Sequence, residues 1–274
     1  MSTQLAEIKE IIKICEMLVD ETIKAGSLKS PVPTYEMYKD LIYSFCNKHN
    51  IKNHSSKLVR TAYSVINSYF WSGSSYTVSP KEASDILQIN NFLKQSLFPD
   101  LYERIFISHC EKDKDSVHEF VQLLYVIGIP RPLKDEKRVI FCTSHPALYI
   151  NNDCRIGDEI YNQFHSNIKT LYFLWYTDNY FKSQACLNEM GAIWVMNKQY
   201  QEILMPDFKR ENIGGLLNKE KINFYANDYN RLNNLKEEIE KMFELQPIAT
   251  NEWEQNRNKF IGKINEIIEK KAKT

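Results

Sequence analysis

Apolar residues recur at three- and four-residue spacing through the first hundred residues, which is the period of amphipathic helices. The spacing predicts helices over residues 5–25, 35–47 and 57–71. A fourth helix is expected from Pro80 to about Leu97, because Ser79 is a good cap and proline favours the first helical position. Residues 1–100 are therefore expected to form an all-α N-terminal domain, whose aromatic side chains we assign to its core.

The pattern changes after residue 100, where short apolar runs alternate with helical segments. Strands are predicted over residues 104–108, 138–142, 170–176, 202–205 and 222–225. Helices are predicted over residues 116–128, 157–165, 183–198, 230–243 and 260–271. The alternation predicts an α/β domain over residues 101–274, a flavodoxin-like parallel sheet with helices on both faces, followed by a C-terminal helical extension.

Composition limits the partners and the location that we expect. Lysine plus arginine number 35 and aspartate plus glutamate number 35, so no net field draws the chain to nucleic acid or an anionic membrane. No signal peptide and no apolar run of membrane-spanning length is recognisable, so we expect a soluble, cytoplasmic protein. The six cysteines form no CxxC pair, which favours small core thiols and implies no metal site.

Candidate chemistry is expected beyond the carboxyl ends of the strands, where doubly wound sheets bind ligands. Ser108-His109 follows the first predicted strand of the sheet, and Ser144-His145 follows the second. No glycine-rich phosphate loop follows the first strand, so neither a standard dinucleotide-binding site nor a P-loop is predicted.

The helix predicted over residues 183–198 is apolar nearly all round, which is typical of a buried helix. Glu189 shares a face of this helix with Ala185, Ala192 and Ile193. A carboxylate there is costly unless it is paired or lies in a cleft. From this pattern alone, a catalytic acid and a structural ion pair are equally good interpretations of Glu189.

Three segments of the chain, in this order, resemble bacterial TIR (Toll/interleukin-1 receptor) domains. Residues 105–109, Ile-Phe-Ile-Ser-His, resemble the opening strand and turn of the family. Residues 140–160 resemble its second strand, BB loop and following helix, and residues 179–194 resemble its third helix, which carries Cys-x-x-Glu. The last segment is the most specific match, and its acid is Glu189.

The resemblance implies an enzyme that cleaves the nicotinamide–ribose bond of NAD+ as a substrate, with no further cofactor. Glu189 would be the catalytic residue, whose carboxylate stabilises the ribose cation. Phe106, Ser108 and His109 would line the nicotinamide side of the pocket, and Ser144 and His145 would begin the loop that gates it. The product would be ADP-ribose or a cyclic or modified form of it.

The resemblance also implies a setting for this activity. Such proteins often serve in bacterial antiphage defence, assemble through their TIR domains into homo-oligomers, and can take an activating partner at an N-terminal helical domain. One position departs from the family, because Ala185 stands where an aromatic residue usually precedes the cysteine. Phe181 and Trp175 are nearby candidates for the missing ring.

Two other functions remain open at this point. TIR domains also act as non-catalytic adaptors by self-association, in which case Glu189 is structural and the BB loop is a contact surface. Enzymes with a nucleoside deoxyribosyltransferase-like fold also use a glutamate on an open α/β sheet. An open cleft beside Glu189 would favour an enzyme, whereas an ion pair there would favour an adaptor.

Overall fold

The computed structural model describes residues 3–69, 76–132, 139–142, 168–213 and 223–273. The chain divides into two compact units, Met1–Asp100 and Leu101–Thr274, which we describe separately. Among the described residues, no helix combines the length and the apolar character needed to cross a membrane.

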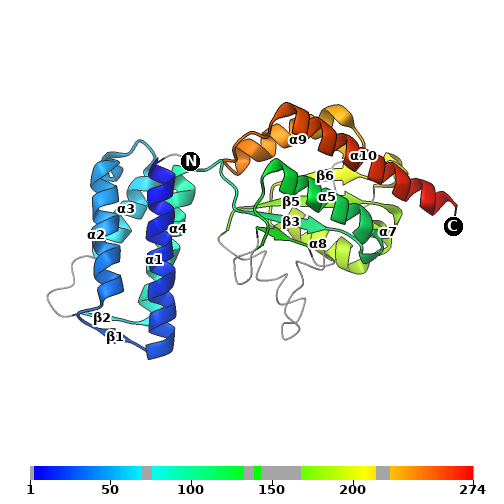
Figure 1. Ribbon diagram of the computed structural model, residues 1–274. Helices are drawn as coiled ribbons and strands as arrows, with labels where there is room; N and C mark the ends of the chain where they lie inside the picture. The colour runs from blue at the N-terminus through cyan, green and yellow to red at the C-terminus, as the bar shows by residue number, and fades with distance from the viewer. Residues whose placement is uncertain (1–2, 70–75, 133–138, 143–167, 214–222, 274) are drawn as a thin grey trace. The chain divides into compact units, whose positions relative to one another are not determined.

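The N-terminal unit consists of helices α1 (Thr3–Ala25), α2 (Pro33–Lys48), α3 (Lys57–Tyr69) and α4 (Pro80–Leu97), as the periodicity predicted (Figure 1). The predicted cap of α4 is present, since the Ser79 hydroxyl accepts the Glu82 amide and the Glu82 carboxylate accepts the Ser79 amide. A short antiparallel pair was not predicted: β1 (Leu28–Lys29) pairs with β2 (Thr77–Val78). Two residues are too few to show a strand period.

The second unit contains a five-stranded parallel sheet, which confirms the predicted fold class. Its strands are β3 (Arg104–Ser108), β4 (Ile140–Phe141), β5 (Thr170–Tyr176), β6 (Tyr200–Leu204) and β7 (Phe224–Tyr225). Their order across the sheet is β4-β3-β5-β6-β7, and every neighbouring pair is parallel. When the strands are numbered within this sheet, this is the flavodoxin-like strand order. In that order the succession of strands changes direction beside the first strand, here β3.

Helices cover both faces of this sheet (Figure 1). On one face lie α5 (Lys114–Ile127), α9 (Tyr229–Met242) and α10 (Thr250–Ala272), and on the other lies α8 (Gln184–Val195). Between β5 and α8 a short helix, α7 (Asp178–Lys182), was missed by the sequence analysis. The terminal helix begins at Thr250, earlier than the predicted residue 260. The helix predicted over residues 157–165 lies outside the described residues.

Strand register shows which side chains share a face of the sheet. Ser108, Leu174 and Glu202 occupy one row across β3, β5 and β6. Alternation places Trp175 on the opposite face, where its ring lies 5.2 Å from that of Phe120 in α5. The row that contains Ser108 therefore belongs to the face covered by α8.

The prediction that α8 is buried all round is wrong. Cys186, Met190 and Ile193 are buried and form its inner face. Leu187 is 37% exposed, Trp194 47% and Val195 73%. An apolar composition measures how well a helix could be buried, whereas actual burial depends on what the fold places against each side.

Candidate functional site

Glu189 lies at the carboxyl end of the central strands, facing the last residue of β3. Its helix begins where the Ser183 hydroxyl accepts the Cys186 amide at 3.4 Å, a standard cap. One helical turn further on, the Glu189 Oε2 atom accepts a hydrogen bond of 2.6 Å from the Ser108 hydroxyl. The structure thus brings together two of the predicted site residues, which stand 81 positions apart in the chain.

The Ser108 hydroxyl has a second partner in Tyr180, which the sequence analysis did not identify. Tyr180 lies on α7 and is fully buried. Its hydroxyl oxygen is 3.0 Å from Ser108 Oγ, and it donates to the carbonyl oxygen of Cys186 at 3.3 Å. A chain of four oxygen atoms therefore runs from Glu189 through Ser108 and Tyr180 to the Cys186 backbone.

Burial raises the pKa of Glu189 to about 7, and the hydrogen bond from Ser108 opposes this shift. The residue as a whole is half-buried, but its carboxyl group is sufficiently desolvated for burial to dominate. Among the described residues, no lysine, arginine or histidine forms an ion pair with it. Within that part of the chain, the structural ion-pair interpretation therefore has no support, and Glu189 can change its protonation state near neutral pH.

Phe106 lies on the same face of β3 as Ser108, two residues before it. Its side chain is only 1% exposed, because it stacks against Phe141 at 5.3 Å and contacts Tyr172 at 5.5 Å between ring centroids. In this structure Phe106 supports the sheet beneath Ser108.

His109 is also buried. Its Nδ1 atom lies 3.3 Å from the carbonyl oxygen of Ile107 and 3.8 Å from the Cys142 sulfur. Burial lowers the pKa of His109, which favours the neutral ring. Ser144 and His145, the other predicted binding residues, lie outside the described residues.

Asp113 is a second buried acid at this edge of the sheet, and its partners indicate a structural role. Its carboxylate accepts hydrogen bonds from the Thr177 hydroxyl at 2.6 Å and the Asn179 amide at 3.0 Å. Lys271, from α10, forms an ion pair with it at 3.3 Å. Asp113 thereby connects the segments after β3 and β5 to the C-terminal helix.

Glu202 is a third buried acid, which the sequence analysis also missed. It is 1% exposed and lies in the same row as Ser108, two strands away. Tyr176 donates to it at 3.4 Å and the Asn223 amide at 3.3 Å. Strand alternation could have identified it, because it is an acid at an inward-facing position of an apolar strand.

The ring that Ala185 lacks is not supplied by Trp175. The Trp175 indole lies on the opposite face of the sheet, where its nitrogen donates to the Ser116 hydroxyl at 3.1 Å. Phe181 is on the correct side, 5.5 Å from the Tyr180 ring, although it stacks closely on Phe208 at 5.4 Å. Ala185 itself is exposed.

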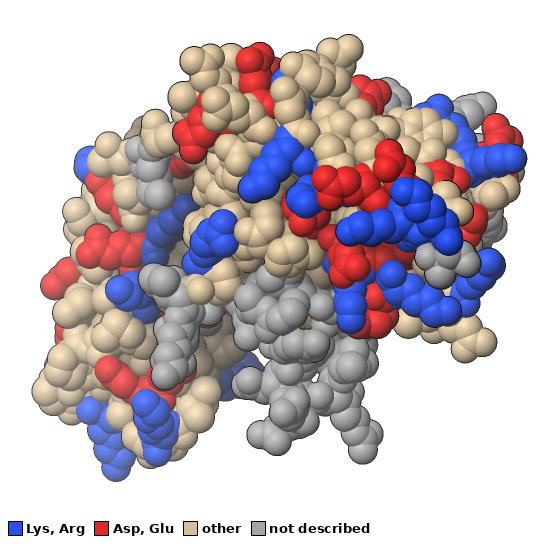
Figure 2. All heavy atoms as spheres, turned by 45° about the vertical axis from the view of Figure 1, so that its right-hand side comes forward, with Lys and Arg blue, Asp and Glu red and all other residues tan. Residues whose placement is uncertain are grey.

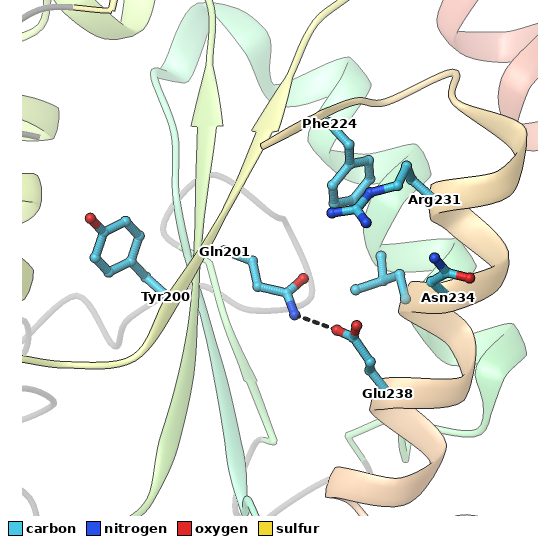
Figure 3. Close-up of a pocket in the computed structure, with 7 residues that line it drawn as sticks. Tyr200, Gln201, Phe224, Arg231, Asn234 and Glu238 are labelled. Carbon is cyan, nitrogen blue, oxygen red and sulfur yellow. Dashed lines mark hydrogen bonds between the residues drawn. The ribbon is translucent and has the colours of Figure 1, made fainter. Parts of the chain in front are cut away.

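A separate pocket of about 370 Å³ lies between α9 and strands β6 and β7, and Glu189 is not among the residues that line it (Figure 3). It is lined by residues of β6, β7 and α9: Tyr200, Gln201, Phe224, Arg231, Asn234, Leu235 and Glu238. Gln201 donates to Glu238 at 2.8 Å across it. None of the residues predicted from the sequence as site residues lines this pocket.

Neither a surface of one charge sign nor a metal site stands out in what can be seen of the described residues. On the face seen in Figure 2, basic and acidic side chains are interspersed. Among the described residues, no group of three or more His, Cys, Asp or Glu side chains is arranged to hold a metal ion.

Comparison with known proteins gives one informative similarity. No protein-family profile matches the chain. No solved structure matches it either. The chain is 36% identical over 165 residues to "Uncharacterized protein YddK" of Bacillus subtilis (strain 168), and the match covers 60% of this chain and 58% of that protein. The chain is therefore similar to a bacterial protein over somewhat more than half the length of each.

Proposed function

We propose that this chain is a TIR-domain NAD+ nucleosidase or cyclase, with Glu189 as its catalytic residue. The observation that carries the proposal is the Glu189 carboxyl group itself, with its pKa raised to about 7 and its 2.6 Å hydrogen bond to Ser108. It lies at the carboxyl edge of a parallel sheet with flavodoxin-like strand order, where such sheets bind ligands. NAD+ is proposed as the substrate because the segments around Ser108 and Glu189 resemble those of TIR domains.

The proposed reaction requires a negative charge beside the ribose. When the nicotinamide–ribose bond breaks, its electron pair leaves with nicotinamide, and the ribose becomes an oxocarbenium-like cation. Ionised Glu189 would stabilise this cation and accept hydrogen bonds from the ribose hydroxyls. Attack by water then gives ADP-ribose and a proton, whereas attack by a group of the same molecule gives a cyclic product.

Other residues would support Glu189. Ser108 orients the carboxylate, while Phe106 holds the strand end in place. His109 contributes an uncharged side chain to the wall of the pocket. That Phe106 and His109 line the nicotinamide side of the pocket remains a proposal, and both rings are buried in the described structure. Ser144 and His145 remain proposed gate residues.

The wider setting is proposed on the same resemblance. We infer a cytoplasmic enzyme of bacterial antiphage defence that assembles through its TIR domains. The N-terminal unit would receive an activating partner or drive assembly.

A second candidate function is favoured by the exposed apolar residues of α8. Leu187, Trp194 and Val195 recur at helical spacing on the helix that carries Glu189. An apolar stripe of this kind is typical of a surface that contacts protein. A non-catalytic adaptor acting by self-association would use that surface without requiring the Glu189 carboxylate.

One experiment separates these functions. The full chain, at high concentration and with a crowding agent, is incubated with NAD+ or with nucleosides, and the released base and second product are identified by chromatography. We expect nicotinamide release from NAD+ by the wild type and by Glu237→Gln, an exposed control acid, but not by Glu189→Gln. Absence of turnover in all proteins would favour the adaptor, and base release from nucleosides alone would favour a deoxyribosyltransferase-like enzyme.

A further inference from the structure

Three side chains and one backbone carbonyl form the hydrogen-bond chain that ends at Glu189. The relevant distances are 2.6 Å from Ser108 Oγ to Glu189 Oε2, 3.0 Å from Ser108 Oγ to Tyr180 Oη, and 3.3 Å from Tyr180 Oη to the Cys186 oxygen. Each of these three oxygen pairs is a gap that one proton can bridge as a hydrogen bond. The Cys186 carbonyl can only accept, so the direction of the chain is fixed at that end.

Counting protons shows that this chain is complete in only one protonation state. Ser108 and Tyr180 bring one hydroxyl proton each, which fills two gaps when Glu189 is ionised. When Glu189 is protonated it brings a third, so that it donates to Ser108, Ser108 donates to Tyr180, and Tyr180 donates to the carbonyl oxygen of Cys186. A buried hydrogen-bonding group that lacks its proton or its acceptor is costly, so the complete chain favours protonated Glu189.

We propose that Tyr180 is a positioning residue, which acts through the Ser108 hydroxyl to favour the protonated form of Glu189 until substrate displaces that arrangement. Tyr180 does not need to touch substrate for this role. Its ring is fully buried, and its hydroxyl has Ser108 on one side and the Cys186 backbone on the other. The consequence for turnover rests on the proposed NAD+ cleavage, in which the ionised form of Glu189 acts.

The titratable groups around this chain are few in the described residues. They are the Cys186 thiol on α8, Cys110 and Asp113 after β3, Tyr176 on β5 and Glu202 on β6. Burial is the largest cause that raises the pKa of Tyr180, and the nearby Glu189 and Glu202 carboxylates also disfavour its ionisation. Tyr180 therefore remains protonated and always has one proton to donate.

Removal of the Tyr180 hydroxyl should lower the pKa of Glu189. In Tyr180→Phe the protonated state loses two hydrogen bonds, from Ser108 to Tyr180 and from Tyr180 to the carbonyl oxygen, whereas the ionised state loses one. Loss of one net hydrogen bond predicts a downward shift of about 0.5–1 pH unit. In Ser108→Ala the protonated state loses two neutral hydrogen bonds, whereas the ionised state loses one charge-assisted bond of about twice the strength, so the midpoint should move less than in Tyr180→Phe.

The test is an NMR titration of the full chain labelled with ¹³C at glutamate carboxyl carbons, in which Glu189→Gln identifies the Glu189 signal. Tyr176→Phe is the matched control, since its buried hydroxyl contacts Glu202 and Met190 instead. We expect a lower midpoint in Tyr180→Phe, a smaller shift in Ser108→Ala, and a change of less than about 0.2 pH unit in Tyr176→Phe. An unchanged or higher midpoint in Tyr180→Phe, or an equal shift in Tyr176→Phe, would overturn the proposal.

Turnover provides a second readout that separates this inference from the proposed function. If the wild type cleaves NAD+, the acid limb of kcat/KM should move downward in Tyr180→Phe together with the NMR midpoint. If the NMR midpoint moves while no variant cleaves NAD+, the positioning role stands and the proposed reaction fails. If the limb stays in place while the midpoint moves, Glu189 ionisation does not govern turnover.

Discussion

Replacing Glu189 with glutamine should stabilise the α/β unit, and the gain should depend on pH. The carboxyl has a pKa of about 7 in the folded chain, compared with an ordinary value of 4.5. The folded state therefore binds an extra proton between these values, and the contribution of Glu189 to stability falls as pH rises through this window. Above pH 7 the buried Glu189 carboxylate destabilises the folded state to its full extent, and below about pH 4.5 this destabilisation vanishes.

The difference between the two pKa values corresponds to roughly 3 kcal/mol, because each pKa unit is worth about 1.4 kcal/mol. Since Glu189 keeps some contact with solvent, we expect roughly 2–3 kcal/mol of added stability in Glu189→Gln at pH 8. At pH 5 the gain should be less than about 1 kcal/mol. Glutamine preserves the shape of the side chain and can still hydrogen-bond to Ser108.

Urea unfolding followed by tryptophan fluorescence measures this effect. Three of the four tryptophans, Trp175, Trp194 and Trp253, lie in the second unit, so the signal reports mainly on its unfolding. Glu237→Gln, on the exposed side of α9, is the control and should change stability by less than about 0.5 kcal/mol at either pH. A gain in Glu189→Gln that is the same at pH 5 and pH 8, or a loss at pH 8, would refute the argument.

Three further predictions concern the scaffold and are measured by the same urea titration or by thermal unfolding. Asp113→Ala should destabilise the second unit by about 3 kcal/mol because it removes a buried carboxylate with three partners. The exposed control, Asp115→Ala, should cost less than about 0.5 kcal/mol, and equal effects would contradict the role of Asp113. Ser79→Ala should cost about 1 kcal/mol in the N-terminal unit by removing the capping box of α4, and an unchanged midpoint would show that the cap is dispensable. Gly128→Ala should cost about 1 kcal/mol of stability because Gly128, at the end of α5, has a φ of +115°. Gly262→Ala, in the middle of α10 where a Cβ meets open space, should add about 0.5–1 kcal/mol. A change of the same sign in both variants would contradict this reasoning.

Much of the fold was predictable because its signals are local. Helical and strand periods, the Ser79 cap and the alternation after residue 100 identified most of the described elements within a few residues. The missed elements are those with weak local signals. The helix α7 has five residues, although its Thr177 cap, whose hydroxyl accepts the Tyr180 amide, was a usable clue.

The candidate site was predictable only in part. Glu189 stood out because an acid within an apolar helix is unusual, and Ser108 because it ends a strand. Tyr180 gave no such signal, since its contact with Ser108 spans 72 positions in the chain and depends on how α7 and β3 meet. Burial of single side chains also depends on the assembled fold, which is why a helix of apolar composition exposes Trp194.

The most direct test of the central claim is the initial rate of nicotinamide release from NAD+ at pH 8, measured for wild type and Glu189→Gln under identical conditions of assembly. Loss of a charge that stabilises the ribose cation is expected to lower the rate by about 100-fold or more, while the added stability of the variant shows that it remains folded. Equal rates in the two proteins would contradict a catalytic role for Glu189. Absence of release by the wild type would contradict the proposed enzyme.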